Sequence, residues 1–296
     1  MKDKSKRVLV AASLTRGRDA AFHRGLAIAR ASGAELYLLH AVPADQAFST
    51  GASDRLQRRE ELQALAAQAG VITKAVEQHG DPAAIIHLHA TTKGVDLVVM
   101  GADHPYGARW LRHSSVAERV LRRTTTPTLI VAGDDEGASA FTNVLVAVDL
   151  SPGSRALVDV AARVAAGDSP RMTVLHAVTG IESAAAVQTY ARWMVPEYRT
   201  HLLRDAHREL ETVVGDVARD VEIRLRTTAG PAARTIADQA EAMGADLVVV
   251  GRSGRFRPLG STALRVLHAK KRALLVVPVT NAVRPLIVRQ AHRTAA

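Results

Sequence analysis

The residues best suited to chemistry in this chain are one aspartate and a set of glycines and hydroxyl side chains in its second half. Asp149 follows an apolar run, and the segment from Gly251 to Gly254 follows another. After five intervening residues, Gly260-Ser261-Thr262 reads as the start of a helix. Glycine lets a backbone approach a ligand closely, and a helix N-terminus offers free N–H groups to an anion. The pattern predicts a phosphate cradle at the glycines, with Asp149 accepting hydrogen bonds from a ribose hydroxyl or an adenine amino group.

Each of these residues also has a purely structural interpretation. Asp149 could end a strand and cap the turn Ser151-Pro152-Gly153, and Ser261 could be only a helix N-cap. The glycines could serve only to shape a tight connection between a strand and a helix. Three arginines in that connection could either add positive charge beside a phosphate or be ordinary solvated charges. They are Arg252, Arg255 and Arg257.

An internal repeat indicates the architecture that would position these residues. Four segments recur in the same order along the chain, which indicates a duplication. The matched pairs are 8–14 with 144–150 and 39–42 with 175–178, both 136 residues apart, 94–101 with 244–251, 150 apart, and 126–131 with 271–276, 145 apart. The second copy therefore has 14 extra residues between its second and third matched segments.

Strand and helix patterns alternate within each copy. The strands are continuous Val/Leu/Ile runs, as expected when both faces of a sheet are covered, and the helices carry apolar residues at a three-to-four spacing. We therefore predict an α/β fold of two tandem doubly wound domains, each a mostly parallel five-stranded sheet with helices on both faces. In the second copy we expect strands at about 143–149, 171–178, 220–228, 245–250 and 273–277, and helices at about 152–166, 190–218, 231–243 and 260–269.

The chain divides into two predicted domains, a linker between them and a tail. We expect a first domain over residues 1–136, a second over 142–280 and a basic tail over 281–296, with a polar linker at 134–139. An open α/β sheet binds ligands beyond the carboxyl ends of its strands, where the strand order reverses. Asp149 and Gly251 each follow a predicted strand, so both are expected at such an edge of the second domain.

The glycine spacing, combined with these repeats, resembles the universal stress protein family. The family signature is Gly-x2-Gly-x9-Gly-Ser/Thr after the fourth strand, with an Asp at the end of the first strand. The second copy has both ends of this signature but five residues, not nine, between Gly254 and Gly260. The phrases at 115–121 and 127–131 add to the resemblance, which covers roughly residues 5–133 and 142–279.

The resemblance implies a Rossmann-like fold and a nucleotide site in the second domain. In ATP-binding members the signature wraps the phosphates and ribose, and the aspartate helps to hold adenine. The expected cofactor is ATP or a related adenine nucleotide, with Mg²⁺ present only if ATP is bound. The residues assigned by position are Ala147, Asp149, Ala177, Val250, Gly251, Gly254, Gly260, Ser261 and Thr262. Without a nucleotide, the apolar members of this set would be ordinary packing residues.

The first copy departs from the signature in another way. Its spacing is intact, but His104 and Ser114 replace two glycines, and Ser13 stands where the second copy has Asp149. A Cβ at each former glycine would crowd a phosphate. We expect the first domain to be mainly structural and to bind nucleotide poorly.

Composition excludes several functional classes. The chain has no cysteine, so disulfides and thiol catalysis are excluded. The formal net charge of +10 arises mostly in residues 141–296, where 21 basic and 14 acidic residues give +7. No basic run is interleaved with aromatic residues, so the stacking platform of single-strand binders is not expected. We expect no signal peptide and no membrane span, and a cytoplasmic location.

The function expected from the sequence is a stress-response module that binds an adenine nucleotide in its second domain and contacts a still unidentified protein partner. A nucleotide-free scaffold is the alternative, and a slow ATPase and a nucleic-acid binder are weaker ones. We assign no catalytic residue and no metal site. His40 and His176 are expected to be satisfied structural imidazoles. Since similar proteins pair domains through their last strands, the resemblance implies an internal pseudo-dimer, and the chain could also form a homodimer.

Overall fold

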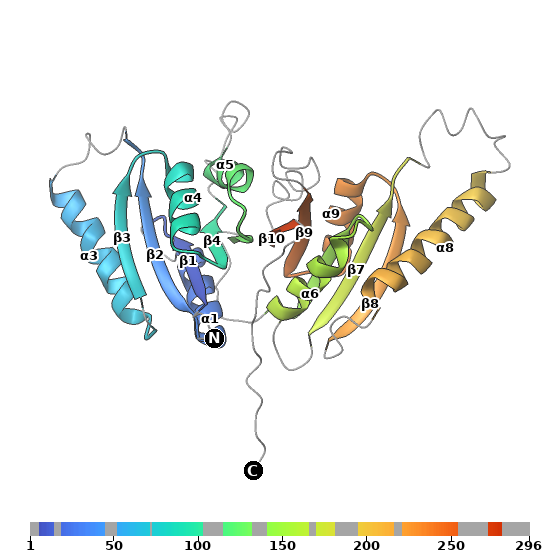
Figure 1. Ribbon diagram of the computed structural model, residues 1–296, viewed down its shortest axis with the longest axis horizontal. Helices are drawn as coiled ribbons and strands as arrows, with labels where there is room; N and C mark the ends of the chain where they lie inside the picture. The colour runs from blue at the N-terminus through green and yellow to red at the C-terminus, as the bar shows by residue number, and fades with distance from the viewer. Residues whose placement is uncertain are drawn as a thin grey trace, which may run out of the picture. The chain divides into compact units, whose positions relative to one another are not determined.

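The chain divides into two compact units, unit 1 within Met1–Ser139 and unit 2 within Ala140–Pro285. Figure 1 shows both units. The computed structural model describes residues 6–14, 19–44, 52–71, 73–102, 115–131, 141–165, 170–180, 195–215, 221–253 and 272–279. Among the helices in these ranges, none combines the length and the apolar character needed to cross a membrane.

Unit 1 is a five-stranded parallel sheet with helices between its strands. The strand order is β3-β2-β1-β4-β5. The strands up to β3 are therefore added on one side of β1, and β4 and β5 on its other side. The strands are β1 (Arg7–Ala11), β2 (Glu35–Val42), β3 (Thr73–His79), β4 (Leu97–Gly101) and β5 (Thr128–Val131). The helices are α1 (Ala20–Ser32), α3 (Ala52–Gln68), α4 (Pro82–Thr92) and α5 (Val116–Arg123).

Unit 2 repeats this topology with the order β8-β7-β6-β9-β10, again with every described pairing parallel. Its strands are β6 (Asn143–Val148), β7 (Arg171–Val178), β8 (Glu222–Ala229), β9 (Leu247–Ser253) and β10 (Ala273–Val279). Its helices are α6 (Ser154–Val164), α8 (Val195–Val214) and α9 (Ala232–Ala242). The predicted α/β fold of two tandem, doubly wound parallel sheets is confirmed. The helix expected at 260–269 lies outside the described residues.

Helices cover both faces of each sheet because parallel strands need crossover connections, which are almost always right-handed. In unit 2 the helices α6 and α8 contact each other, as expected for two crossovers that run in the same direction. In unit 1 the helices α4 and α5, which connect the strands from β3 to β5, also contact each other. The sheets between these layers hold the core, whose fully buried side chains are mainly aliphatic, for example Leu9, Leu38, Leu97 and Leu145.

The strand register corrects one of the repeat matches. Val98 of β4 pairs with Thr128 of β5, whereas Val248 of β9 pairs with Leu274 of β10. Thr128 therefore corresponds to Leu274, a separation of 146 residues, and the match of 126–131 with 271–276 at 145 was wrong by one residue. In a strand, a slip of one residue moves every side chain to the other face, so only the pairing pattern fixes this register.

Candidate functional site

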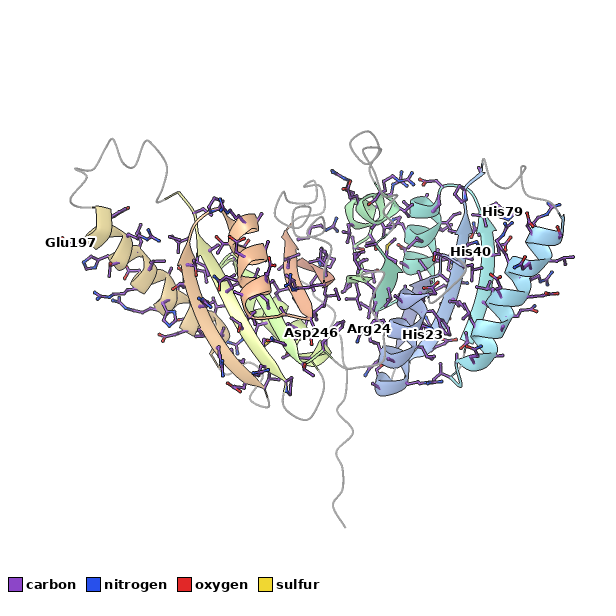
Figure 2. The ribbon with its side chains drawn as sticks, turned by 180° about the vertical axis from the view of Figure 1, so that it is seen from behind. His23, Arg24, His40, His79, Glu197 and Asp246 are labelled. Carbon is purple, nitrogen blue, oxygen red and sulfur yellow. The ribbon has the colours of Figure 1, made fainter. Side chains whose placement is uncertain are left out.

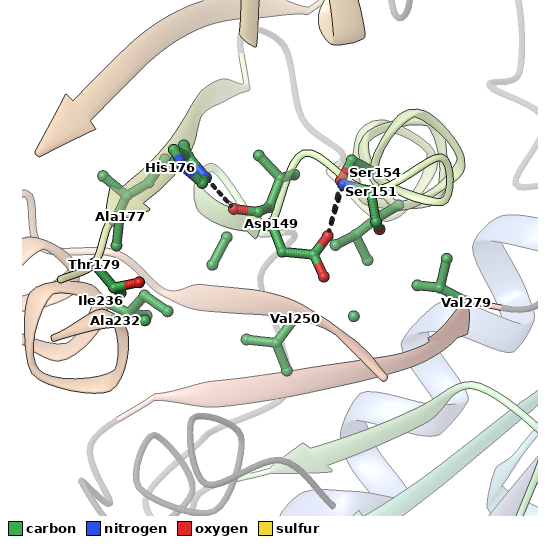
Figure 3. A pocket seen from close by; sticks show the side chains of 15 residues that line it. Asp149, Ser151, Ser154, His176, Ala177, Thr179, Ala232, Ile236, Val250 and Val279 are labelled. Atoms are coloured by element: carbon green, nitrogen blue, oxygen red, sulfur yellow. Dashed lines mark hydrogen bonds between the residues drawn. The ribbon is translucent and has the colours of Figure 1, made fainter. Parts of the chain in front are cut away.

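A cavity of about 390 Å³ opens at the carboxyl ends of β6, β7 and β9 in unit 2 (Figure 3). The central strand β6 pairs with β7 on one side and with β9 on the other, so this is the point where the strand order reverses. Ligands of open α/β sheets bind at such a point, and the volume lies within the usual range for small-molecule sites. The walls also include the first turns of α6 and α9, through Ser154 and Ala232.

Asp149 is the acid at this cavity. Its Oδ1 accepts a hydrogen bond from the backbone N–H of Ser151 (3.1 Å) and one from the hydroxyl of Ser154 (3.2 Å). Figure 3 shows the second carboxylate oxygen turned toward the cavity. One oxygen therefore caps the turn before α6, as the structural interpretation required, while the other stays available to a ligand.

The charge of Asp149 is stabilised by the same contacts. Partial burial of the carboxyl at the cavity wall would by itself raise its pKa, but the hydrogen bonds from Ser151 and Ser154 outweigh this effect, so the pKa lies below its usual value. The group is therefore a carboxylate at neutral pH, able to accept hydrogen bonds but not to donate one.

The backbone directly after Asp149 is strained. Leu150 has φ +59°, in the left-handed region that a branched residue seldom adopts, and Leu14 at the equivalent place in unit 1 has φ +49°. The repetition in both units shows that the turn itself demands this geometry. In unit 2 the turn directs Asp149 back toward the sheet edge and the cavity.

His176 forms part of the same wall. Its Nδ1 lies 2.9 Å from the carbonyl oxygen of Val148, and His40 in unit 1 makes the same 2.9 Å contact with Ala12. A carbonyl can only accept, so Nδ1 carries the proton in both rings. Both imidazoles tie two neighbouring strands together, in agreement with the expected structural role.

Gly251 and Val279 lie at the other wall of the cavity, and Gly153 lies against Val279. A Cβ on Gly251 would come within 2.9 Å of a Val279 methyl and 3.4 Å of Leu157, and a Cβ on Gly153 would overlap Val279. Glycine is therefore required at both positions by the side chain of Val279. This methyl-bearing side chain also occupies part of the space next to the Gly251 backbone.

The predicted site residues fall into three groups. Those that line the cavity together are Ala147, Asp149, Ala177, Val250 and Gly251. Arg252 does not lie in a loop: β9 continues to Ser253, because β10 pairs with it as far as Val279, and Arg252 is 6% exposed. Burial lowers the pKa of Arg252, which is not among the residues lining the cavity. The rest lie outside the described residues, namely Gly254, Arg255, Arg257, Gly260, Ser261 and Thr262.

Sequence reasoning missed several residues of the cavity wall. Ser151 and Ser154 contact Asp149, and their spacing of two and five residues after an aspartate is a signal that could have found them. His176 was considered but not assigned to the site. Val279 lies far away in sequence, and only the pairing of Ser253 with Val279 in the sheet brings it to this edge.

The equivalent place in unit 1 is arranged differently. Ser13 replaces the aspartate, and its N–H donates to Asp19 Oδ2 (3.0 Å). The other oxygen of Asp19 accepts from Phe22 N (3.0 Å) and so caps α1. Both carboxylate oxygens are used by the chain itself. Within the residues that the structure describes, no group of three or more His, Asp or Glu side chains could hold a metal ion.

Comparisons with known proteins agree with this architecture. The model of the universal stress protein family matches residues 4–132 and 140–278. Universal stress protein A homolog 2 of Coxiella burnetii is 31% identical over 145 residues, which cover 47% of this chain and 96% of that protein. Homolog 1 of the same organism is 27% identical over 143 residues, covering 46% and 96%.

A solved structure extends the likeness over both units. The universal stress protein from Archaeoglobus fulgidus superposes with a TM-score of 0.67 at 18% identity, covering 93% of this chain and 97% of that one. At this identity the likeness supports the fold, while the two family matches cover both units. The chain therefore belongs to the universal stress protein family, with one family domain in each half.

Proposed function

We propose that unit 2 binds ATP or a related adenine nucleotide in the cavity beside Asp149, and that its occupancy regulates contacts with a protein partner. One observation carries the proposal. A carboxylate with one oxygen fixed by Ser151 and Ser154 directs its other oxygen into a cavity of about 390 Å³, at the strand-order reversal. Membership of the family adds support, because its ATP-binding members use an aspartate at this position.

In this proposal the carboxylate of Asp149 accepts from the adenine amino group or a ribose hydroxyl, next to the backbone of Ala177 at the end of β7. The phosphates lie toward Gly251, where the lack of a side chain lets the backbone approach them. Gly254, Gly260, Ser261 and Thr262 would complete the phosphate cradle, and Mg²⁺ would enter only with ATP.

Unit 1 serves mainly as a structural partner in this proposal. Ser13 cannot replace the charge of Asp149, and Asp19 is committed to capping α1. We further propose that the two domains associate as an internal pseudo-dimer and that the protein acts in the cytoplasm as a regulatory module and not as an enzyme.

A nucleotide-free scaffold is the second candidate, and one observation favours it. Val279 covers the side of Gly251 that faces Leu157, so a phosphate that approached from that side would meet a methyl group. The connection between Gly254 and Gly260 is also four residues shorter than in the family signature. In this case the cavity would be a remnant, and the surface of the units would carry the function.

Calorimetric titration of the full chain with ATP separates the two candidates. Asp149→Asn keeps the shape and an oxygen that can accept from Ser151, so the variant should fold, yet it loses the charge and should bind ATP at least about tenfold more weakly. The matched control is Asp159→Asn, on an exposed side chain of α6 that pairs with Arg163 at 2.9 Å. No ATP binding by the unaltered chain, or equal affinity in both variants, would favour the scaffold.

A further inference from the structure

A second cavity of unit 2 lies at the end of the sheet where the strands begin, away from Asp149. Its volume is about 470 Å³. Arg171 is the first residue of β7 and Asn143 the first of β6, and Met243 comes directly after α9. The other lining residues are Thr173, Arg224, Leu225 and Arg226. We refer to this cavity as the arginine groove.

The three arginines of the groove lie on one face of two neighbouring strands. Figure 1 shows β7 and β8 side by side, and Thr173 is directly opposite Arg224 in their pairing. Residues two apart in a strand share a face, so Arg171 lies on the face of Thr173, and Arg226 lies on that of Arg224. Alternate residues lie about 6.6 Å apart and neighbouring strands about 4.8 Å apart. Arg224 therefore starts between the other two, about 8 Å from Arg171 and about 6.6 Å from Arg226, while Arg171 and Arg226 start about 14 Å apart.

The positive charge of the groove is only partly balanced. Arg224 pairs with Glu222, whose Oε1 accepts from Nη2 at 2.8 Å and from Nε at 3.0 Å. The guanidinium groups of Arg171 and Arg226 have neither a hydrogen bond nor an ion pair with any residue in the described ranges. Like charges repel one another, and an extended anion that reached both guanidinium groups past Arg224 would reduce the repulsion.

The equivalent positions on β2 and β3 of unit 1 show how an anion fits between cations at this place in the sheet. Glu35 occupies the position of Arg171, and Lys74 that of Arg224. The carboxylate of Glu35 contacts Lys74 Nζ at 2.6 Å and Arg7 Nε at 3.3 Å, and Tyr37 OH donates to it at 3.2 Å. Unit 1 therefore supplies its own anion to its cations. Unit 2 has an arginine in place of that carboxylate and a cavity beside it.

We propose that the arginine groove binds a small compound that carries two or more linked phosphate groups. Guanidinium groups hold phosphate oxygens with pairs of charge-assisted hydrogen bonds, and three guanidiniums around one cavity match a polyphosphate better than a single phosphate. The volume suits a small molecule. None of the lining residues is aromatic, so the groove offers no platform on which the bases of a single-stranded nucleic acid could stack.

Titration of the full chain with inorganic triphosphate in about 20 mM NaCl tests the groove, since surface charges are little screened at this ionic strength. Arg171→Gln/Arg226→Gln should lower the affinity at least about tenfold. The charge-matched control is Arg208→Gln/Arg234→Gln, which removes two exposed arginines of α8 and α9, at 74% and 81% side-chain exposure. Its affinity should stay within about twofold of that of the unaltered chain.

Comparing orthophosphate, triphosphate and ATP identifies the class of ligand. Orthophosphate should bind at least about tenfold more weakly than triphosphate, because it spans only one guanidinium pair. ATP is compared with triphosphate in the Asp149→Asn background, which removes the site proposed for ATP. If Arg171→Gln/Arg226→Gln then lowers both affinities equally, the phosphate chain alone is recognised; a loss confined to ATP would overturn the proposal. NMR signals of the side-chain Nε–Hε groups of Arg171 and Arg226 should shift on addition of triphosphate, which separates this groove from the cavity at Asp149.

Three results would overturn the proposal. Unchanged triphosphate affinity in Arg171→Gln/Arg226→Gln would show that the groove is not the site. Equal losses in this variant and in Arg208→Gln/Arg234→Gln would attribute the binding to net charge. Displacement of triphosphate by a single-stranded oligonucleotide at equal phosphate concentration would identify the ligand as nucleic acid.

Discussion

Val279, the last residue of β10, packs over Gly153 at the start of α6, and any side chain at position 153 would overlap it. The same valine lies against Gly251, where an added Cβ would come within 2.9 Å of its methyl group. The side chain of Val279 thus fills the corner between Gly251, which lines the cavity, and Gly153. Whether a phosphate can reach the Gly251 backbone depends on this corner.

We predict that Val279→Ala increases the affinity for ATP by about three- to tenfold, because it opens the space next to Gly251 without removing a polar group. Calorimetric titration measures the change. The control is Val277→Ala, on the same face of β10 but fully buried, which should lower stability by about 1–3 kcal/mol and leave ATP affinity unchanged. Equal ATP affinities for Val279→Ala and the unaltered chain would show that the valine does not restrict the site.

Asp81 should stabilise α4 in a pH-dependent way. It is the N-cap, accepting from Ala83 N at 3.3 Å, and it contacts Arg119 and Arg123 of α5. The hydrogen bond from Arg123 is the main cause that lowers the pKa of Asp81 below 3.8, against a smaller opposing effect of burial. Asp81→Ala should cost about 1 kcal/mol through the lost cap, while the exposed ion pairs add little.

The sign of the pH effect follows from this depressed pKa. The carboxylate contributes its full stabilisation above the unfolded value of about 3.8, and the contribution is lost as the pH falls through the lower folded value. Asp81→Asn keeps a capping oxygen but no charge. Its melting temperature should therefore lie below that of the unaltered chain at pH 6 and approach it at the acid end of this window, as followed by calorimetry. A constant difference at all pH values would contradict the assigned ion pairs.

The sequence was sufficient for the fold because both signals behind it are local or repeated. Strand–helix alternation follows from apolar patterning, and the duplication allows each copy to check the other. Asp149 and Gly251 could be placed at the sheet edge for the same reason, since each directly follows a strand. The ends of helices are less well predicted. Pro231 was expected at the first helical position, but it is the N-cap, and α9 begins at Ala232.

Apart from Ser151 and Ser154, whose contacts with Asp149 are local, the features that escaped prediction depend on strand register. We expected the strand β9 at about 245–250 with Arg252 in the connection after it, yet pairing with β10 carries β9 through Ser253, and Arg252 is buried. Val279 reaches the cavity for the same reason. The arginine groove also depends on register, because only the pairing of Thr173 with Arg224 sets Arg171 and Arg226 on a common face. Pairings between distant segments are decided by packing of the whole sheet and leave no local mark.

Asp246 should hold the beginning of the unit 2 sheet together. Its carboxylate accepts from Thr142 N at 2.8 Å, from the Thr142 hydroxyl at 3.1 Å and from Asn143 N at 3.1 Å, at the end of the sheet where β6 and β9 begin (Figure 2). In unit 1, Asp96 accepts from Arg7 N at 2.9 Å at the equivalent position. The repeated contact indicates a structural function for the acid in both copies.

Asp246→Ala is expected to cost about 2–3 kcal/mol, because it leaves backbone donors at the start of β6 without their acceptor. Native-state hydrogen exchange should show faster exchange of the Asn143 amide, and calorimetry a lower melting temperature. Asp238→Ala, at an exposed side chain of α9, is the control and should change stability by less than about 0.5 kcal/mol. Protection of the Asn143 amide that survives Asp246→Ala would exclude this role.

At position 150, a glycine variant should be more stable than an alanine variant, which is the reverse of the usual order. At most positions glycine is the less stable of the two, because it has more freedom in the unfolded chain. At φ +59° a Cβ costs roughly 1–2 kcal/mol, which glycine avoids. Both substitutions remove the leucine side chain, so their difference isolates the backbone. We predict that Leu150→Gly is more stable than Leu150→Ala by about 1 kcal/mol in calorimetric unfolding. Leu14, at φ +49°, should behave in the same way in unit 1, and a more stable alanine variant at either position would contradict the left-handed turn there.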